Sequence, residues 1–221
     1  MELFTIGHSN HSLETFIQLL HQHQITALAD VRSHPYSRYL PHFSQSQLKQ
    51  ALEQVGIKYV FLGQELGARP QNSNCYVDGK ALYNRIAGTP EFKQGLERVT
   101  EGVQKYRIAL MCAEQDPITC HRAILVSPAL KNLGCEIQHI LKTGNLESHR
   151  DLELRLLKLH NLQPKSDSAT IQGRQLSIFD ALDFPSEPPE EPPLSEAERL
   201  EKAYQLQGDQ IAYTEKSSSE K

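Results

Sequence analysis

Short runs of apolar residues alternate with stretches of helical periodicity through the first 160 residues or so of the chain. This alternation is typical of units in which helices connect parallel strands and cover the sheet that those strands form. The pattern therefore predicts an α/β fold, a single three-layer domain with a mostly parallel sheet of about five strands flanked by helices. The predicted strands cover residues 3–7, 27–32, 58–63, 107–112 and 136–141.

Capping residues indicate where the predicted helices begin. Ser44 and Gln47 fit the Ser-x-x-Gln capping box, and Thr89 is placed to cap a helix whose first residue is Pro90. Residues 64–79 contain too many turn-forming residues for a regular element, so we expect a long surface or functional loop there.

The composition changes after the α/β domain, which we assign to residues 1–163. Residues 164–183 are predicted to be a tether that carries one apolar peptide. Residues 184–193 hold five prolines and three glutamates, a composition that favours an extended linker. A short helix is predicted over residues 194–206. We expect residues 184–221 as a whole to be a flexible, acidic tail that is disordered or partly helical.

Composition and charge narrow the classes of function. No apolar stretch is long enough to cross a bilayer, and the first ten residues lack the basic and apolar parts of a secretion signal, so we expect a cytoplasmic protein without membrane contact. Residues 1–163 carry 17 Lys and Arg against 15 Asp and Glu, and the remainder carries 6 against 12. This balance argues against bulk electrostatic adhesion to nucleic acid but allows local positive patches.

Polar and reactive side chains gather where the predicted strands end. Ligands bind outside the carboxyl ends of the strands of a parallel sheet, because the loops converge there. The candidate site residues are therefore His8, Ser9, Asn10, Asp30, Arg32, Ser33, Arg38, Cys112, Glu114, Cys120, His121 and Arg122.

Cys120 is predicted to lie at the start of a helix that Gly134 ends. Unpaired amide groups at a helix start and the adjacent His121 and Arg122 favour a thiolate over a thiol, so Cys120 is a candidate nucleophile. Cys112 is the other candidate. His8 or His121 would carry protons with Glu114, and the remaining candidates would bind an anionic substrate.

Alternative interpretations stay open at this point. Cys112 and Cys120 could simply pack in the core, and His8 could have a structural role in a loop or in the core. Two arginines, Arg32 and Arg38, could form ordinary ion pairs with Asp30 or Glu65. The two cysteines with His121 and a second histidine could bind a metal, although the cysteine pairing that is typical of zinc sites is missing. No phosphate-binding glycine loop or serine-hydrolase elbow is present, and we expect no cofactor and no metal.

Four sequence motifs together resemble the bacterial domain of unknown function 488 family. They read "TIGHSN", "ADVRSHPYSR", "GIKYVFLGQELGARP" and "ALMCAEQDPITCHR", and the resemblance runs from about residue 3 to residue 140. It implies a single α/β domain whose motif positions include the twelve candidates above, and it supplies no settled reaction. Ala68 departs from the pattern, where we expect a second glycine. A weaker likeness to rhodanese domains rests on "DVR" after a strand.

An apolar pentapeptide lies in the tether. Gln175, Leu176, Ser177, Ile178 and Phe179 resemble the peptide with which bacterial repair and replication proteins dock on the DNA sliding clamp. The apolar side chains would fill a groove while Gln175 makes an orienting hydrogen bond. The alternative is that this peptide packs back on its own domain.

These observations lead to competing hypotheses of function. The first is an enzyme that binds an anionic substrate, such as a nucleotide, a nucleic acid or another phosphate-bearing molecule, with a link to DNA repair or replication. The second is a non-catalytic adaptor tethered to the sliding clamp. The third is a rhodanese-like sulfur carrier or a metal-binding protein. The sequence favours the enzyme narrowly.

Overall fold

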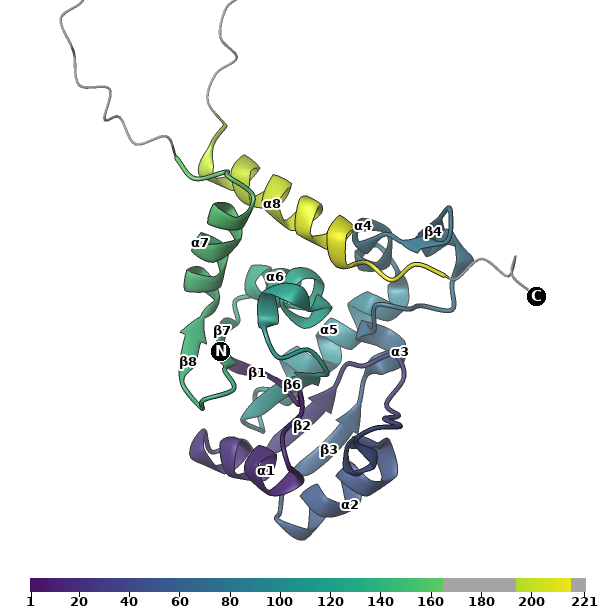
Figure 1. Cartoon of the computed structure of the whole chain (residues 1–221), viewed down its shortest axis with the longest axis vertical. Coiled ribbons are helices and arrows are strands. Elements are labelled where there is room, and N and C mark those ends of the chain that lie inside the picture. The colour runs from purple at the N-terminus through teal and green to yellow at the C-terminus, as the bar shows by residue number, and fades with distance from the viewer. Residues whose placement is uncertain (165–193, 216–221) are drawn as a thin grey trace, which may run out of the picture.

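The structure, a computed structural model, describes residues 1–164 and 194–215 of the 221-residue chain. The apolar peptide 175–179 and the linker 184–193 lie outside the described residues. A six-stranded sheet forms the centre of the domain in the order β3-β2-β6-β1-β7-β8, with β8 the antiparallel strand (Figure 1). The strands are β1 Glu2–Gly7, β2 Ala27–Asp30, β3 Lys58–Phe61, β6 Ile108–Cys112, β7 Glu136–Ile140 and β8 Leu146–Ser148.

The α/β fold class and all five predicted strands are confirmed. Strand β8 was not predicted, because three residues at the edge of a sheet are too short to show a period. The prediction that residues 64–79 form no regular element is wrong. The structure places there the helical turn α3 Gly63–Leu66 and the strand β4 Tyr76–Val77, which pairs with β5 Lys80–Ala81.

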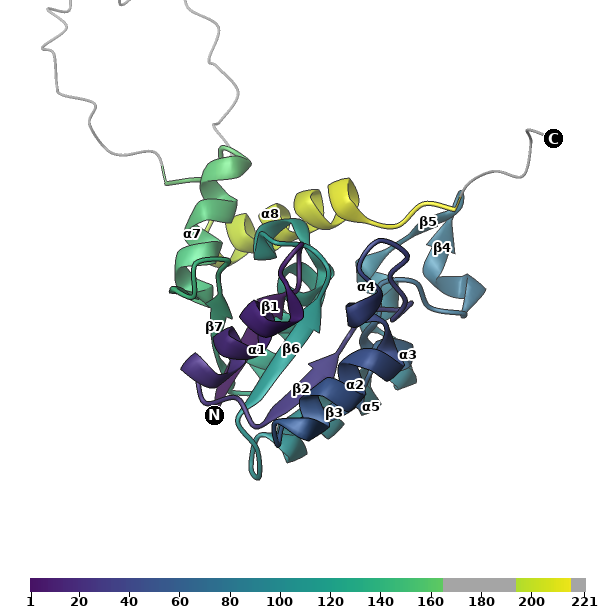
Figure 2. The same ribbon diagram turned by 60° about the horizontal axis from the view of Figure 1, so that its bottom comes forward.

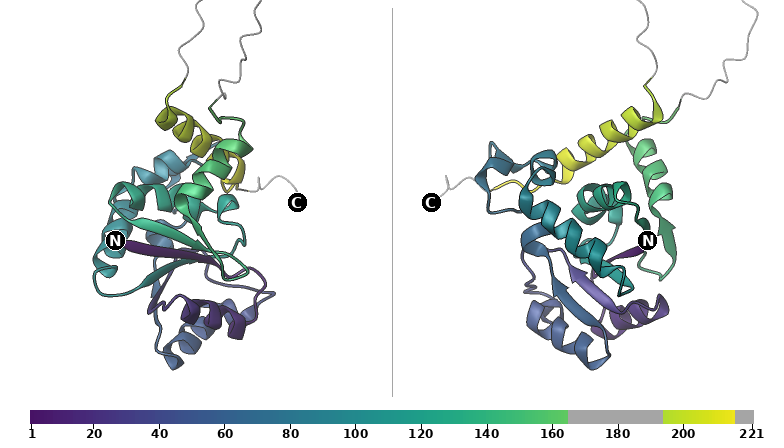
Figure 3. Two further views of the ribbon diagram at one scale, coloured as in Figure 1. Left: turned by 90° about the vertical axis from the view of Figure 1, so that its left-hand side faces the viewer. Right: turned by 180° about the vertical axis from the view of Figure 1, so that it is seen from behind.

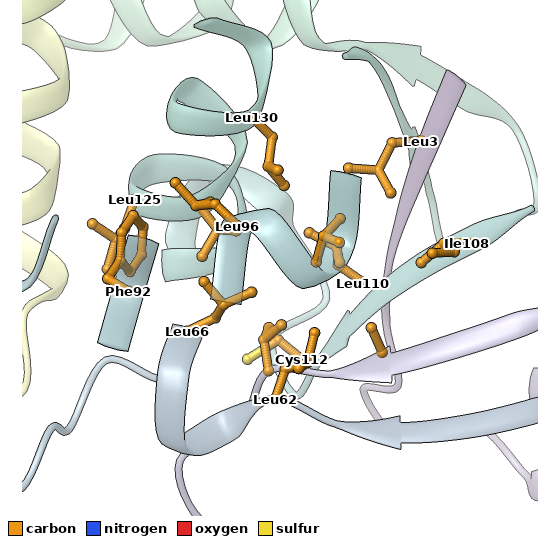
Figure 4. Close-up of a cluster of buried hydrophobic side chains, with 14 of the residues drawn as sticks. Leu3, Leu62, Leu66, Phe92, Leu96, Ile108, Leu110, Cys112, Leu125 and Leu130 are labelled. Atoms are coloured by element: carbon orange, nitrogen blue, oxygen red, sulfur yellow. The ribbon is translucent and has the colours of Figure 1, made fainter. Parts of the chain in front are cut away.

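Helices cover both faces of the sheet because successive strand residues point to opposite sides. On one face, Phe4 and Met111 pack against α1 Leu13–Gln22 and α2 Gln45–Gln54 (Figure 2). On the other face, Leu110 and Cys112 join a larger cluster with α3, α5 Pro90–Gly102 and α6 Ser127–Asn132 (Figure 4). The remaining helices are α4 Tyr83–Ala87, α7 His149–Leu159, α8 Glu196–Ile211 and the 3-10 turns Pro41–Phe43, Ser73–Cys75 and Pro117–Thr119.

Helix caps follow the sequence in one case and depart from it in another. Thr89 accepts a hydrogen bond from the Phe92 amide, with Pro90 opening α5 as predicted. The predicted capping box at Ser44 is wrong. Ser44 holds the N-cap position of α2, but its hydroxyl accepts a hydrogen bond from the Ser37 amide, 3.2 Å away, and caps no amide of the helix. The side chain is thereby committed to the preceding loop.

The helix after Cys120 is not a regular α-helix in its first part. Residues Arg122–Val126 form a π-helical turn, and α6 continues from it. Pro128 has no amide hydrogen, so the helix cannot make the normal bond at that position. The Ser127 amide and hydroxyl both donate to the carbonyl of Arg122, five residues earlier, which is the bond pattern of a π-helical turn. Such π-turns are frequent at functional sites.

The helix predicted near the C-terminal end is present as α8, and it packs on the domain. Ser195 and Glu198 form a reciprocal capping box at its start. The helix contacts α7 and the π-helical turn, and the residues after it reach the β4–β5 hairpin (Figure 3). The described residues 194–215 therefore cover the domain. No helix among the described residues is both long enough and apolar enough to span a membrane.

A chain of buried polar side chains attaches α8 to the sheet. Thr5 Oγ1 lies 2.7 Å from His139 Nδ1, and His139 Nε2 lies 3.0 Å from His149 Nδ1. His149 Nε2 lies 3.0 Å from the hydroxyl of Tyr204, which also donates to Glu153. Burial lowers the pKa of His149 to about 4, and burial with the neighbouring His149 lowers the pKa of His139. Both rings are therefore held neutral.

This buried histidine pair predicts a loss of stability in acid. Above pH 6.5 the rings are neutral in both the folded and the unfolded chain, and their full contribution is present. As the pH falls from 6.5 towards 4, His149 binds a proton in the unfolded chain but not in the folded one. This difference lowers the free energy of unfolding by up to about 3 kcal/mol. Urea unfolding at pH 7 and pH 4.5 measures the effect.

His149→Gln is expected to reduce this dependence on pH, because glutamine does not titrate. His21→Gln, at an exposed histidine of α1, is the matched control. Identical pH dependence in the two variants contradicts the prediction.

Candidate active site

A cavity of about 330 Å³ opens at the carboxyl ends of β2 and β6, the edge of the sheet where the sequence predicts a site. Six of the predicted site residues line it, namely Arg32, Ser33, Cys112, Glu114, Cys120 and His121. The other lining residues are His34, Tyr36, Ala68, Arg69, Tyr83, Ala113, Thr119, Ile211 and Tyr213.

The end of β1 fixes the turn that carries Cys112 and Glu114. The amides of His8 and Ser9 donate to the carbonyls of Cys112 and Ala113, each at 2.9 Å, so the two chains run together beyond the sheet. Gly7 makes this close approach possible, because a Cβ atom at this position would lie 1.9 Å from the Glu114 carbonyl oxygen. The turn is therefore held on the side of the cavity.

The 3-10 turn before Cys120 is fixed from three sides. Asp116 caps it by accepting from the Ile118 amide, and Arg155 of α7 forms an ion pair with Asp116 at 2.8 Å. From α8, Gln207 donates to the Ile118 carbonyl at 2.9 Å. Cys120 therefore leaves a turn with little freedom and enters the cavity wall at a defined point.

Two thiols share one carboxylate oxygen at the bottom of the cavity. Cys112 donates to Glu114 Oε2 at 3.1 Å, and Cys120 donates to the same oxygen at 3.0 Å. Both cysteine residues are almost fully buried, at 3% and 1% exposed, so their sulfur atoms are recessed in the cavity. The structure thus brings both candidate nucleophiles together with the candidate acid.

His121 completes this cluster from the helix side. Its Nε2 lies 3.0 Å from the Val31 carbonyl oxygen, which accepts a hydrogen bond and so places the proton on Nε2. Its Nδ1 then faces the sulfurs, 3.7 Å from Cys112 and 3.9 Å from Cys120. Cys112, Glu114, Cys120 and His121 are called the thiol cluster below.

The two thiols of the cluster differ in acidity. The hydrogen bond to Cys120, together with burial, raises the pKa of Cys112 well above its usual range. Burial acts to raise the pKa of Cys120 as well, but the hydrogen bond from Cys112 and the charge of Arg122 outweigh burial and hold it well below its usual range. The pair therefore loses its first proton at Cys120.

The neighbours of the Cys120 thiolate respond to its charge. Burial acts to lower the pKa of His121, but the hydrogen bond and the negative charge of Cys120 outweigh burial and raise it. Burial and the same negative charge raise the pKa of Glu114. The three shifts thus favour a negative charge on Cys120, a positive charge on His121 and a proton on Glu114 more than the ordinary pKa values of these groups do.

Arg122 does not provide a ligand for an anion, which corrects the expectation from the sequence. Its side chain is fully buried and donates to the carbonyls of Glu114 at 2.8 Å and Gln115 at 3.2 Å. Its Nε has no hydrogen-bond partner among the described residues. Arg122 therefore ties the turn after β6 to the helix after Cys120, and it acts on the thiol cluster through its charge.

Arg32 lines the cavity, but a carboxylate already neutralises it. It forms a bidentate ion pair with Asp30, whose two oxygens lie 2.9 and 2.6 Å from the guanidinium, and it donates to the Phe43 carbonyl. Tyr59 also donates to Asp30 at 2.7 Å. The alternative of an ordinary ion pair, which the sequence left open, is the arrangement observed.

His8 lies beside Arg32 and outside the cavity lining. Its ring stacks on Phe43 at 4.3 Å, and its Nε2 lies 3.2 Å from Arg32 Nη1. Burial and the charge of Arg32 lower the pKa of His8 to about 4, so it stays neutral at pH 7. The His8 ring bonds to the Ser9 carbonyl and Arg32 and to no side chain of the thiol cluster in the described part of the chain, so His121 is the histidine whose ring meets the cysteines.

The three remaining predicted residues also lie outside the lining of the cavity. Ser9 donates to Asn10 and Gln115 at the surface. Arg38 is exposed in the loop before the turn Pro41–Phe43. The structure thus places these side chains outside the cavity, whose lining takes the loop after β2 only as far as Tyr36.

Comparison with known proteins identifies the family. The family model described as "Domain of unknown function DUF488" matches residues 12–128, just over half of the chain. The chain belongs to the DUF488 family. No curated protein and no solved structure matches it. The match contains all of the thiol cluster, whereas His8, Ser9 and Asn10 precede it.

Several lining residues of this DUF488 protein were missed by the analysis of the sequence. Arg69 and Tyr83 follow β3, so the rule of strand ends could have included the loop that carries Arg69. Ile211 and Tyr213 lie beyond the family match, at the end of α8 and after it. No local signal marks these two residues, because only packing across the whole chain brings them to the cavity.

The role of Arg122 predicts a large effect of its removal. Arg122→Met leaves the carbonyls of Glu114 and Gln115 without donors, so we expect a loss of about 2–3 kcal/mol in the free energy of unfolding. Urea unfolding at pH 7 measures it.

Arg150→Met is the control, because Arg150 makes an exposed ion pair with Glu196 and its loss should cost less than about 1 kcal/mol. Equal stability of the two variants contradicts the assigned role of Arg122.

Proposed function

We propose that this DUF488 protein is an enzyme that uses the Cys120 thiolate as a nucleophile on an anionic substrate. The observation that carries the proposal is the convergence of two thiols, a carboxyl group and an imidazole at the bottom of a cavity whose wall includes the exposed Arg69. Clusters with perturbed pKa values in a cavity are typical of catalytic sites.

Cys120 is the better of the two nucleophile candidates. Its pKa is lowered whereas that of Cys112 is raised, so Cys120 is the thiol of the pair that forms a thiolate more readily. The Cys112 thiol stabilises that thiolate by hydrogen bonding to it. His121, charged and anchored on the Val31 carbonyl, stabilises it from the other side. The thiolate thus forms without an added base.

Glu114 provides the acid of the proposed reaction. The Cys120 sulfur would form a bond to the electrophilic atom of the substrate, and the leaving group would take the proton that Glu114 holds because its pKa is raised. Glu114 would then remove a proton from the water or second substrate that releases the product. Hydrolysis and group transfer are both compatible with this sequence of steps.

The class of the anion and the link to nucleic-acid metabolism stay proposals as well. Nucleotides and nucleic acids carry the phosphate groups that an arginine-lined cavity binds. Docking of Gln175–Phe179 on a DNA sliding clamp, the adaptor hypothesis, concerns residues outside the described part of the chain and stays a prediction from the sequence.

Alkylation kinetics test the nucleophile. The iodoacetamide reaction of Cys120, followed by mass spectrometry of peptides, should reach half of its maximal rate at a pH below the value of about 8.5 for an ordinary cysteine. His121→Gln should move this midpoint upwards, because the thiolate loses its cationic neighbour.

Cys75→Ser and Cys135→Ser are the matched controls, since both cysteines are buried away from the cavity lining and burial raises the pKa of each. These variants should leave the Cys120 midpoint unchanged. Four cysteines with the same slow reaction would refute the proposal.

A metal centre is a second candidate function, because one observation favours it. The ligand atoms of Cys112, Cys120 and His121 all lie within 4.8 Å of one another. Two thiolates and an imidazole suit Zn²⁺, and three protein ligands with a fourth position facing a cavity are typical of catalytic zinc. The contact between His121 Nε2 and a backbone carbonyl is also the usual support of a metal-binding histidine.

Metal analysis separates the two candidates. If the cluster is a metal centre, protein purified without chelators should contain about one equivalent of zinc. The Cys112→Ser variant should lose this zinc, and the Cys75→Ser variant should retain it. It also predicts that a chelator accelerates alkylation of Cys120. The nucleophile proposal predicts no stoichiometric metal and the same alkylation rate with and without chelator.

A further inference from the structure

The cavity wall opposite the sheet comes from the far end of the described chain. Ile211 and Tyr213 line the cavity together with Cys120, although about ninety residues separate them in the sequence. Both residues also lie beyond the part that matches the family model. The cavity is thus built from a family domain and from a segment, residues 195–215, that the family match does not contain. This segment is called the C-terminal wall.

Buried contacts hold the C-terminal wall in place. Tyr204 bonds to His149 and Glu153 of α7, and Gln207, 2% exposed, bonds to the Ile118 carbonyl and to His160. Ile118 lies two residues before Cys120. The helix α8 therefore braces the turn that carries the nucleophile.

Backbone hydrogen bonds fix the residues that follow α8. The Ala81 amide donates to the Tyr213 carbonyl at 2.8 Å, and the Glu215 amide donates to the Gly79 carbonyl at 2.8 Å. Lys80 and Thr214 form an antiparallel bridge. These contacts add the chain as a further edge to the β4–β5 hairpin, as Figure 2 shows. Main-chain pairing thus holds Tyr213 beside the hairpin, and its side chain packs against the core cluster as well.

The guanidinium group of Arg69 stacks on the ring of Tyr213. Arg69 Cζ lies 4.2 Å from the centre of the Tyr213 ring, and the Arg69 amide donates to Ser33 Oγ at the cavity edge. Arg32, the other cavity arginine, is neutralised by Asp30. Arg69 makes no ion pair with any residue of the described ranges, so its charge is available to a ligand.

We propose that Tyr213 and Arg69 form the subsite that binds the anionic group of the substrate, and that this group is a phosphate. Tyr213 positions the guanidinium by stacking under it, and Arg69 donates two hydrogen bonds to the phosphate oxygens. The thiol cluster lines the same cavity, so a substrate held by its phosphate on Arg69 would present its electrophilic atom to Cys120. This inference deepens the proposed function by naming its substrate class and rests on it for the placement of the reacting end.

Calorimetric titration of the full-length protein with inorganic phosphate tests the subsite. Wild type should bind phosphate, and Arg69→Ala should weaken binding at least tenfold because a charge-assisted pair is lost. Tyr213→Ala should weaken it about fivefold, and Tyr213→Phe should retain binding because the ring remains. The variant that combines Arg69→Ala with Tyr213→Ala should bind phosphate no more weakly than Arg69→Ala alone, since Tyr213 acts through Arg69.

Arg38→Ala, which removes an exposed arginine outside the cavity, is the control and should bind phosphate as wild type does. Absence of binding in wild type, equal binding in wild type and Tyr213→Ala, or equal losses in the Arg38 and Arg69 variants would each overturn the subsite. The readout does not use thiol chemistry. If the protein binds phosphate but Cys120 is unreactive, the proposed nucleophile is refuted and the phosphate subsite is supported. If Cys120 is reactive but the protein does not bind phosphate, the subsite is refuted and the nucleophile is supported.

Discussion

The buried guanidinium of Arg122 is the contact on which the candidate site depends. It bonds to the carbonyls of Glu114 and Gln115 and so ties the turn after β6 to the helix that begins after Cys120. Arg122 thereby holds the strand that ends in Cys112 next to the helix that follows Cys120, and the thiols of these two cysteines share one carboxylate oxygen of Glu114. The same buried charge lowers the pKa of the Cys120 thiol, so one side chain both assembles the cluster and sets its chemistry.

The elements around this contact act together because each holds a different part of the cavity. Gly7 allows β1 to run against the Glu114 turn, and Arg155 and Gln207 hold the turn before Cys120. The buried chain from Thr5 through His139 to His149 connects the middle of the sheet to α8. The domain and the C-terminal wall are therefore one packed unit, and a change in the wall reaches the thiol cluster through Ile118.

Much of the fold could be predicted from the sequence, and so could six of the residues that line the cavity. The strands were found because buried parallel strands leave continuous apolar runs, and Cys112 and Cys120 were found because loops converge at strand ends. The direction of a side chain was not predictable: Arg122 turns inwards to backbone carbonyls, whereas the sequence suggested that it faces a ligand. Tyr213 was not predicted because only long-range packing and main-chain pairing with the β4–β5 hairpin bring it to the cavity.

The most direct test of the account is whether Cys112 and Cys120 face one another in the folded protein. Phenylarsine oxide bridges two neighbouring thiols through one arsenic atom, and mass spectrometry of the intact, full-length protein counts the adducts. The account predicts one arsenic per chain, lost in Cys112→Ser and in Cys120→Ser and kept in Cys75→Ser. A native protein that takes up no arsenic, or an adduct that survives the loss of either cysteine, would contradict the thiol cluster.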